Sequence, residues 1–238
     1  MDLVNIHCHA LWGVDDGAKD RDESCAMLSA MYTSGVRAVC LTPHFDPAGG
    51  IATDVDEIRR RFDELCSGVA QVLPDMKLYL GEEIFSHVDA VNNLTDGVCL
   101  TLNGSRTVLL EFGPFEDASE IISGASKLLT SGYIPVIAHI ERYRSLVKSR
   151  REILRLHEAG ALIQINASTV LGKRGFLMRH FADRLISDGI ADVIADDSHN
   201  MDDRAPCLAE AAKYVSRKFG NDVCERMFLR TPLEILSM

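Results

Sequence analysis

Residues 107–140 read TVLLEFGPFEDASEIISGASKLLTSGYIPVIAHI and contain the pattern that decides the fold. Two short apolar runs, 107–111 and 134–138, flank an amphipathic stretch at 118–131. This order predicts a strand, a helix and a second strand parallel to the first, joined by a right-handed crossover. Because both apolar runs are nearly continuous, we expect the strands to be buried on both faces, as in a closed α/β barrel.

The same alternation continues in both directions along the chain. We expect further strands at residues 3–6, 37–41, 77–80, 161–165 and 193–195, and further helices at residues 23–34, 55–72, 149–159, 176–188 and 205–219. About seven strand–helix repeats without a linker predict one domain, residues 1–238, with a parallel sheet. Strand order cannot be read from this pattern, so a doubly wound open sheet is the alternative to a barrel.

Composition restricts the class of protein. The 238 residues are 47% hydrophobic and 25% charged, and no apolar run approaches the roughly 18 residues that cross a bilayer. The first residues lack the basic region of a signal peptide, so we expect a cytoplasmic protein. A net charge of −10 disfavours a general nucleic-acid binder. Seven scattered cysteines without a CxxC pair are expected to be structural thiols in a reducing compartment.

Five of the eight histidines stand at or just beyond the ends of expected strands, and carboxylates occupy equivalent places. The histidines are His7, His9, His44, His139 and His199, and the acids are Asp16, Glu83, Glu111 and Asp197. In α/β barrels, catalytic groups gather at these strand ends. Side chains of an extended chain alternate with period two, so the two imidazoles of the His-x-His pair should point the same way.

Imidazole and carboxylate ligands without thiolate suit Mn²⁺, Fe²⁺, Zn²⁺ or similar ions rather than a closed structural zinc site. Any one of these residues alone is also explained as a capping or hydrogen-bonding group. Their recurrence at the same place on different strands predicts a metal site. Nine ligands exceed the needs of one ion, so two or three ions are expected. Such sites orient a phosphate and lower the pKa of water from 15.7 to about 7.

Two arginines are candidates for binding phosphate. Arg142 follows His139 by three residues, and Arg204 follows the ADDSHN segment (195–200). A guanidinium at the rim of a metal cluster would grip phosphate oxygens and stabilise charge in the transition state. The alternative is a salt bridge to a neighbouring acid, Glu141 or Asp203. Asn166, at the end of a strand, is either a hydrogen-bonding residue of the site or a turn residue.

Cysteine-based phosphatase chemistry is disfavoured. Cys224 and Arg230 match a Cys-x5-Arg pattern, but the intervening ERMFL has no glycine and follows a helical pattern. A helix cannot wrap its backbone N–H groups around a phosphate as that loop requires. Cys8 alternates away from its histidine neighbours and is expected in the core. The chain also has no GxSxG elbow and no GxxxxGK[ST] loop.

Several segments together resemble one family: IHCHALWGVDDGAKDRDES, TPHF, GEEI, LLEFG, PVIAHIERY, LIQINASTVLG and ADDSHNMDDRAP. They are similar to the PHP (polymerase and histidinol phosphatase) superfamily, specifically to the metal-dependent tyrosine-protein phosphatases of bacterial capsular and exopolysaccharide operons. The resemblance covers nearly the whole chain. It implies a distorted (β/α)7 TIM-like barrel, a trinuclear and usually Mn²⁺-dependent site, and a substrate on the tail of a bacterial tyrosine kinase.

Carried over onto this sequence, the resemblance implies metal ligands at His7, His9, Asp16, His44, Glu83, Glu111, His139, Asp197 and His199. Glu111 would bridge ions, and Asp16, His44 and His199 would hold the third. Arg142 and Arg204 match the phosphate-binding arginines of the family. Asp196 stands where serine is more usual, and this additional acid is expected to shift the metal preference.

The expected activity is therefore hydrolysis of phosphotyrosine by metal-activated hydroxide, with Mn²⁺ or alternatively Fe, Zn, Co or Mg. The nearest alternative is a small-molecule phosphatase of the same superfamily, of the histidinol-phosphate type. A nuclease would use the same metals but fits the acidic composition poorly. A metal-binding regulatory or scaffold protein is the alternative outside enzymes.

Overall fold

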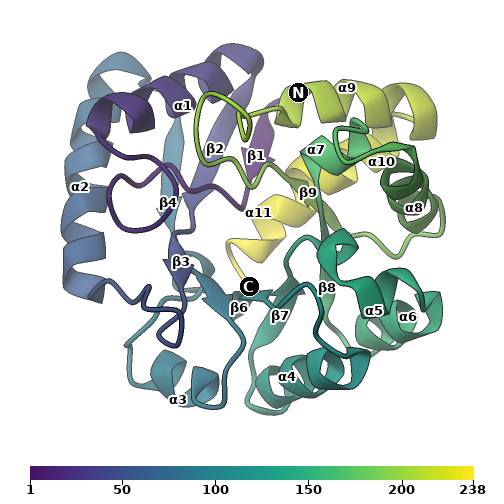
Figure 1. Cartoon of the computed structure of the whole chain (residues 1–238). Coiled ribbons are helices and arrows are strands. Elements are labelled where there is room, and N and C mark those ends of the chain that lie inside the picture. The colour runs from purple at the N-terminus through teal and green to yellow at the C-terminus, as the bar shows by residue number, and fades with distance from the viewer.

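Nine parallel strands form the centre of the molecule in the computed structural model, which describes residues 1–238 (Figure 1). Their bounds are β1 Leu3–Asn5, β2 Val36–Leu41, β3 His44–Phe45, β4 Lys77–Leu80, β5 Glu83–Phe85, β6 Thr107–Glu111, β7 Ile134–Ile137, β8 Leu162–Asn166 and β9 Val193–Ala195. All seven strands expected from the sequence are present. The prediction missed β3 and β5 because runs of two and three residues carry no periodicity.

Strand order follows the chain without a reversal. One sheet has the order β1-β2-β4 and the other β3-β5-β6-β7-β8-β9, and every pairing is parallel. The doubly wound alternative requires a reversal of strand order, so it is wrong. Residues beyond β1 also bond to residues beyond β9, because His9 N donates to Ser198 O (2.9 Å) and Asp197 N donates to His7 O (3.0 Å). The result is a curled parallel sheet.

Helices surround the curled sheet (Figure 1). The longer ones are α1 Arg21–Ser34, α2 Val55–Val72, α4 Ala118–Thr130, α6 Arg150–Glu158, α8 Phe176–Ser187 and α9 Leu208–Phe219. They match the six expected helices, except that α9 begins three residues later than the 205–219 expected from the sequence. Short helices complete the chain: α3 Ala90–Thr95, α5 Arg144–Val147, α7 Ala167–Val170, α10 Asn221–Glu225 and α11 Thr231–Ile235. No helix has the length and apolar character needed to cross a membrane.

The interior of the curl is a small apolar core of its own. Side chains of alternate residues fill it, among them Val4 and Ile6, Ala38 and Cys40, Val136 and Ala138, and Val193 and Ala195. Ile235 and Leu236, at the end of the chain, pack into the same cluster. A larger core lies between the strands and the surrounding helices. Apolar residues therefore fill most of the curl, with Thr107, which donates to Ile235 O (2.7 Å), as a buried polar residue at the amino end of β6.

Truncation of the interior side chain of α11 should be far more costly than truncation of its outer one. Ile235→Ala leaves a cavity at a fully buried position and should lower the free energy of unfolding by about 3 kcal/mol. Leu233→Ala, on the same helix but 43% exposed, should change it by less than about 0.5 kcal/mol. Urea denaturation followed by circular dichroism measures both. Equal effects would show that α11 does not close the interior core.

A second prediction concerns Glu82, which is fully buried and accepts one hydrogen bond, from Leu100 N (2.7 Å). Burial raises its pKa to about 8, above the value of an unfolded chain. Between pH 5 and 8 the folded state therefore holds a proton that the unfolded state has lost, so stability falls as pH rises.

Glu82→Gln should remove this contribution to the pH dependence of the free energy of unfolding, which is on the order of 3 kcal/mol between pH 5 and 8. Urea denaturation at pH 5 and pH 8, with both proteins treated with EDTA, compares the two slopes. Identical pH dependence in the wild type and the variant would contradict a protonated Glu82.

Candidate metal centre

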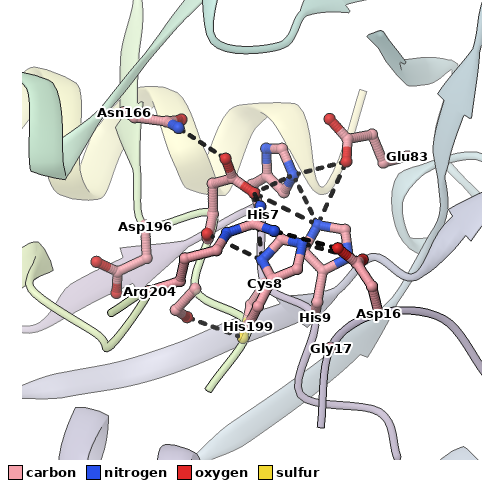
Figure 2. A network of polar contacts seen from close by, with 12 residues as sticks. His7, Cys8, His9, Asp16, Gly17, Glu83, Asn166, Asp196, His199 and Arg204 are labelled. Carbon is pink, nitrogen blue, oxygen red and sulfur yellow. Dashed lines mark hydrogen bonds and ion pairs between the residues drawn. The ribbon is translucent and has the colours of Figure 1, made fainter. Parts of the chain in front are cut away.

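The nine histidines and carboxylates singled out in the sequence converge at the carboxyl ends of the strands, and Figure 2 labels His7, His9, Asp16, Glu83 and His199 among them. Ligand atoms of eight of them fall into three groups, each with atoms within 4.8 Å of one another. The groups are His7, His9, Glu83 and Asp197; His9, Asp16, His44 and His199; and His44, Glu83 and Glu111. The cluster thus joins segments that are far apart in the chain.

His139 completes the cluster by contacting the carboxylates of the third group. Its Nε2 lies 2.9 Å from Glu83 Oε1 and 3.3 Å from Glu111 Oε1. The other oxygen of Glu83 lies 3.1 Å from His7 Nε2, 3.3 Å from His9 Nε2 and 3.1 Å from His44 Nδ1. Glu83, rather than Glu111, therefore belongs to two of the three groups and occupies the centre.

The cluster has the features of a cation site. His7 Nε2 and His9 Nε2 face each other at 3.1 Å, with carboxylates around them. Glu83 Oε2 and His199 Nε2 are buried and form no hydrogen bond of acceptable geometry. Buried polar atoms without partners are costly, and bound cations would satisfy both. The residues present therefore fit divalent ions bound by nitrogen and oxygen ligands.

Electrostatics set the protonation of the ligands. Burial opposes ionisation of Glu83, but His7 and His44 outweigh it and hold the pKa of that carboxyl well below its usual range. Burial and the neighbouring His9 lower the pKa of His199 to about 4. Burial also lowers the pKa of His9, but Asp15 and Glu83 outweigh it and raise the value to about 10. A cation would displace this proton, so rising pH favours metal binding.

Sequence reasoning missed Asp15, which orients two of the histidines. Asp15 Oδ2 accepts from His9 Nδ1 (2.7 Å) and from the backbone N–H of His44 (2.9 Å). A second carboxylate beside Asp16 in the GVDDG segment was the available signal. Gly17 is required in the same turn, because a Cβ there would lie 2.1 Å from His9 O. Carboxylates that hold the outer nitrogen of a metal-binding imidazole fix its orientation.

Gln164, on β8, is the second orienting residue that the sequence did not reveal. Its Oε1 accepts from His7 Nδ1 (3.0 Å) and from the backbone N–H of His139 (3.1 Å). Its Nε2 donates to Asn166 Oδ1 (2.7 Å). Gln164 therefore fixes which nitrogen of His7 faces the cluster.

The backbone bends into the left-handed region at two cluster residues. His139 has φ 31° and Asp197 has φ 52°, values that non-glycine residues adopt at a cost of about 1–3 kcal/mol. Ala138 points into the apolar interior, and His139 directly after it points into the cluster. The left-handed turn lets two successive side chains face the same side, which regular strand alternation forbids.

The two arginines lie at the rim and contact the cluster rather than the acids next to them in sequence. Arg142 pairs with Asp197 through Nη2. Arg204 Nη1 lies 3.2 Å from Asp16 Oδ2, and its Nη2 lies 3.2 Å from Asp197 Oδ1 (Figure 2). The alternative of local salt bridges to Glu141 or Asp203 is wrong. Asn166 Nδ2 donates to Asp197 Oδ2 (2.7 Å), so Asn166 belongs to the site.

Asp196 is directed away from the histidines (Figure 2). Its carboxylate accepts from Cys207 N (2.8 Å) and from Asn5 Nδ2 (3.5 Å), and it belongs to none of the three groups. The expectation that this acid shifts the metal preference therefore has no contact to support it. Burial raises the pKa of Asp196 to about 7.

Cys224 and Cys8 lie where the sequence predicts. Cys224 is buried in α10, and its Sγ lies 3.3 Å from Ala212 O, so the Cys-x5-Arg match forms no loop. Cys8 is fully buried, and all seven cysteines are free thiols. His157 pairs with Asp192, and His180 stacks on Phe176.

Comparison with known proteins gives one consistent result. A family model described as "Capsular polysaccharide synthesis, CpsB/CapC" matches residues 3–237. The chain is 32% identical over 239 residues to tyrosine-protein phosphatase CpsB of Streptococcus pneumoniae, covering 98% of each. It is 30% identical over 222 residues to tyrosine-protein phosphatase YwqE of Bacillus subtilis, covering 93% of this chain and 87% of that one.

Comparison with solved structures gives the same result. The fold matches a chain from the crystal structures of Bacillus subtilis YwqE and Streptococcus pneumoniae CpsB, described as unique metal-dependent tyrosine phosphatases. The TM-score is 0.91 at 28% identity, covering 98% of this chain and 94% of that one. A phosphotriesterase homology protein from Escherichia coli shares the fold alone, with a TM-score of 0.64 at 10% identity and 99% of both chains covered. With a family model spanning nearly its whole length, this chain belongs to the CpsB/CapC family.

Proposed function

We propose that this chain is a manganese-dependent protein-tyrosine phosphatase that acts on a bacterial tyrosine kinase controlling capsular or exopolysaccharide synthesis. One observation carries the proposal: nine imidazoles and carboxylates converge, eight of them in three overlapping groups and His139 beside these, with two arginines at their rim. Relatives named tyrosine-protein phosphatases support the reaction class. They do not favour the alternative of a histidinol-phosphate-type phosphatase.

The cluster would hold two or three ions. His7, His9, Glu83 and Asp197 would bind one. Glu83 and Glu111, with His139 beside them, would bind another, and Asp16, His44 and His199 the third. When bound, such ions lower the pKa of water to about 7 and neutralise phosphate oxygens. Mn²⁺ suits the carboxylates of this mixed donor set, and Fe, Zn, Co or Mg are the alternatives.

The protein's own groups position the phosphate for direct in-line displacement. Arg142 and Arg204 would donate to the non-bridging oxygens, and their pairing with Asp197 already aims both guanidinium groups at the cluster. No nucleophilic side chain is required, so no covalent phosphoenzyme is formed. The tyrosine phenolate, with a pKa near 10, leaves with little protonation. Aryl phosphates should therefore react faster than alkyl phosphates.

We also infer that residues 1–238 form a single PHP-type phosphatase domain with a distorted (β/α)7 barrel. Each of β2–β3 and β4–β5 would count as one broken strand. Gly81 N donates to Leu41 O and Glu83 N to Pro43 O, both at 2.9 Å, which keeps these two segments paired across their interruptions. The hydrogen bonds between residues 7–9 and 197–198 support closure of the ring. Such an enzyme would work in the cytoplasm, on a phosphorylated kinase tail.

Loss of a cluster histidine should abolish turnover. His139→Ala removes an imidazole that contacts both Glu83 and Glu111, and should lower kcat/KM for p-nitrophenyl phosphate with Mn²⁺ at least about 100-fold. Cys224→Ala is the control, because this thiol lies in a helix away from the cluster, and it should retain activity. The opposite pattern would refute metal-dependent catalysis and favour a cysteine nucleophile.

The same assay separates the competing substrates. Wild-type kcat/KM should be higher for a phosphotyrosyl peptide than for histidinol phosphate. A preference for histidinol phosphate would instead support the small-molecule alternative. Cleavage of single-stranded DNA would support a nuclease. No hydrolysis of any of these substrates with any metal would support a scaffold protein.

Asp15→Asn should weaken metal binding while leaving all nine proposed ligands in place. The amide replaces the carboxylate that holds His9 Nδ1, and loss of such a partner typically costs 10–100-fold in affinity. A Mn²⁺ titration by calorimetry measures the shift, and excess Mn²⁺ should restore part of the turnover. Asp75→Asn, at an exposed position without side-chain partners, is the matched control. An unchanged Mn²⁺ affinity in Asp15→Asn would rule out the orienting role.

A further inference from the structure

A cationic cavity opens beside the cluster. It has a volume of about 730 Å³, within the usual range of ligand sites. Five of its nine lining residues are cations: Arg142, Arg144, Lys148, Arg174 and Arg204. Arg142 and Arg204 connect the cavity to the cluster, because both pair with Asp197. A group bound at the cluster would therefore have this cavity as its immediate surroundings.

The other three cations have no anionic partner within the protein. Arg144, Lys148 and Arg174 are exposed, and none forms a salt bridge or a side-chain hydrogen bond. The one acid that lines the cavity, Glu141, is buried and forms no ion pair with these cations, and its Oε1 accepts from Asn166 N (3.1 Å) and Thr169 Oγ1 (2.8 Å). These three charges are therefore free to bind an anionic ligand.

This concentration of positive charge runs against the composition of the chain, whose net charge is −10. Like charges that gather without partners repel one another. Desolvation of the guanidinium and the neighbouring Arg142 both lower the pKa of Arg174. An anion in the cavity would relieve this repulsion and would also be attracted from solution.

Apolar groups at the cavity suit a polypeptide rather than a free small anion. Pro114, Val147 and Met178 contribute to its lining. Phe115, next to Pro114, is 72% exposed, and the Arg144 guanidinium stacks over its ring at 4.4 Å. Exposed aromatic residues beside unpaired arginines are typical of surfaces that bind protein segments.

We propose that Arg144, Lys148 and Arg174 form a specificity site for carboxylate side chains that flank the phosphotyrosine of the substrate. The inference rests on the proposed function, because it requires the phosphate to lie at the cluster. With the phosphate held by Arg142 and Arg204, neighbouring peptide residues enter the cavity, where the three free cations select aspartate and glutamate. Substrate choice is then made by charge outside the reacting groups.

Three phosphotyrosyl peptides that differ only in having alanine, glutamate or lysine around the phosphotyrosine test the proposal. Wild-type kcat/KM, measured by phosphate release, should be about fivefold higher for the glutamate peptide than for the alanine peptide, and lowest for the lysine peptide. The difference should reside mainly in KM. It should shrink at 500 mM NaCl, because salt screens exposed charges.

The double variant Lys148→Glu with Arg174→Glu should reduce the glutamate-to-alanine ratio to about one or below. Arg151→Glu with Arg184→Glu is the matched control, because these cations are also exposed and unpaired but lie outside the cavity, and it should keep the wild-type ratio. Arg174→Lys, which conserves the charge, should retain most of the preference.

Equal wild-type kcat/KM for the glutamate and alanine peptides would overturn the proposal, as would a preference that survives in the double variant. The wild-type comparison decides the matter even if the double variant does not fold. Failure of the proposed function looks different, since the wild type would then hydrolyse neither p-nitrophenyl phosphate nor any of the peptides.

Discussion

The buried carboxylate of Glu83 is the centre on which the site depends. Its two oxygens lie within 3.3 Å of nitrogens from His7, His9, His44 and His139, four residues from three separate parts of the chain. An ionised carboxylate without solvent contact is tolerated only when positive charge surrounds it. Every neighbouring strand must therefore end at the same level, and this requirement explains the broken strands and left-handed turns at this end of the sheet.

The rest of the fold offsets the cost of that polar end. Inside the curl, the residues below the cluster are small or aliphatic, and the last residues of the chain cover the opposite end. Parallel strands whose interior is dry at one end can hold charged groups at the other without admitting water throughout. The orienting contacts from Asp15 and Gln164 add rigidity at the level of the cluster itself. The apolar packing that stabilises the curled sheet and the polar groups of the site thus lie at opposite ends of the same strands.

The sequence predicted the longer strands and helices well, but it predicted the shortest strands and individual side-chain contacts poorly. Strand–helix alternation identified seven strands and six helices, and the registers of the histidines identified the nine residues that converge. The strands β3 and β5 were not predicted, because runs of two or three residues are too short to show a hydrophobic periodicity. Gln164 escaped because a lone amide in an apolar strand resembles any buried polar residue. Asp196 misled for a related reason: the sequence shows that an acid is adjacent to Asp197, but not that the backbone turns it to the other face.

The arginines that hold the reacting phosphate and the cations that select the substrate peptide are two separate sets of residues. Asp197 engages Arg142 and Arg204 directly, so neither can change without disturbing the cluster. Arg144, Lys148 and Arg174 contact no cluster residue and belong to loops and short helices at the rim, where substitution costs little stability. Because the inner arginines are tied to Asp197 and the outer cations are not, substrate preference can change independently of the reaction.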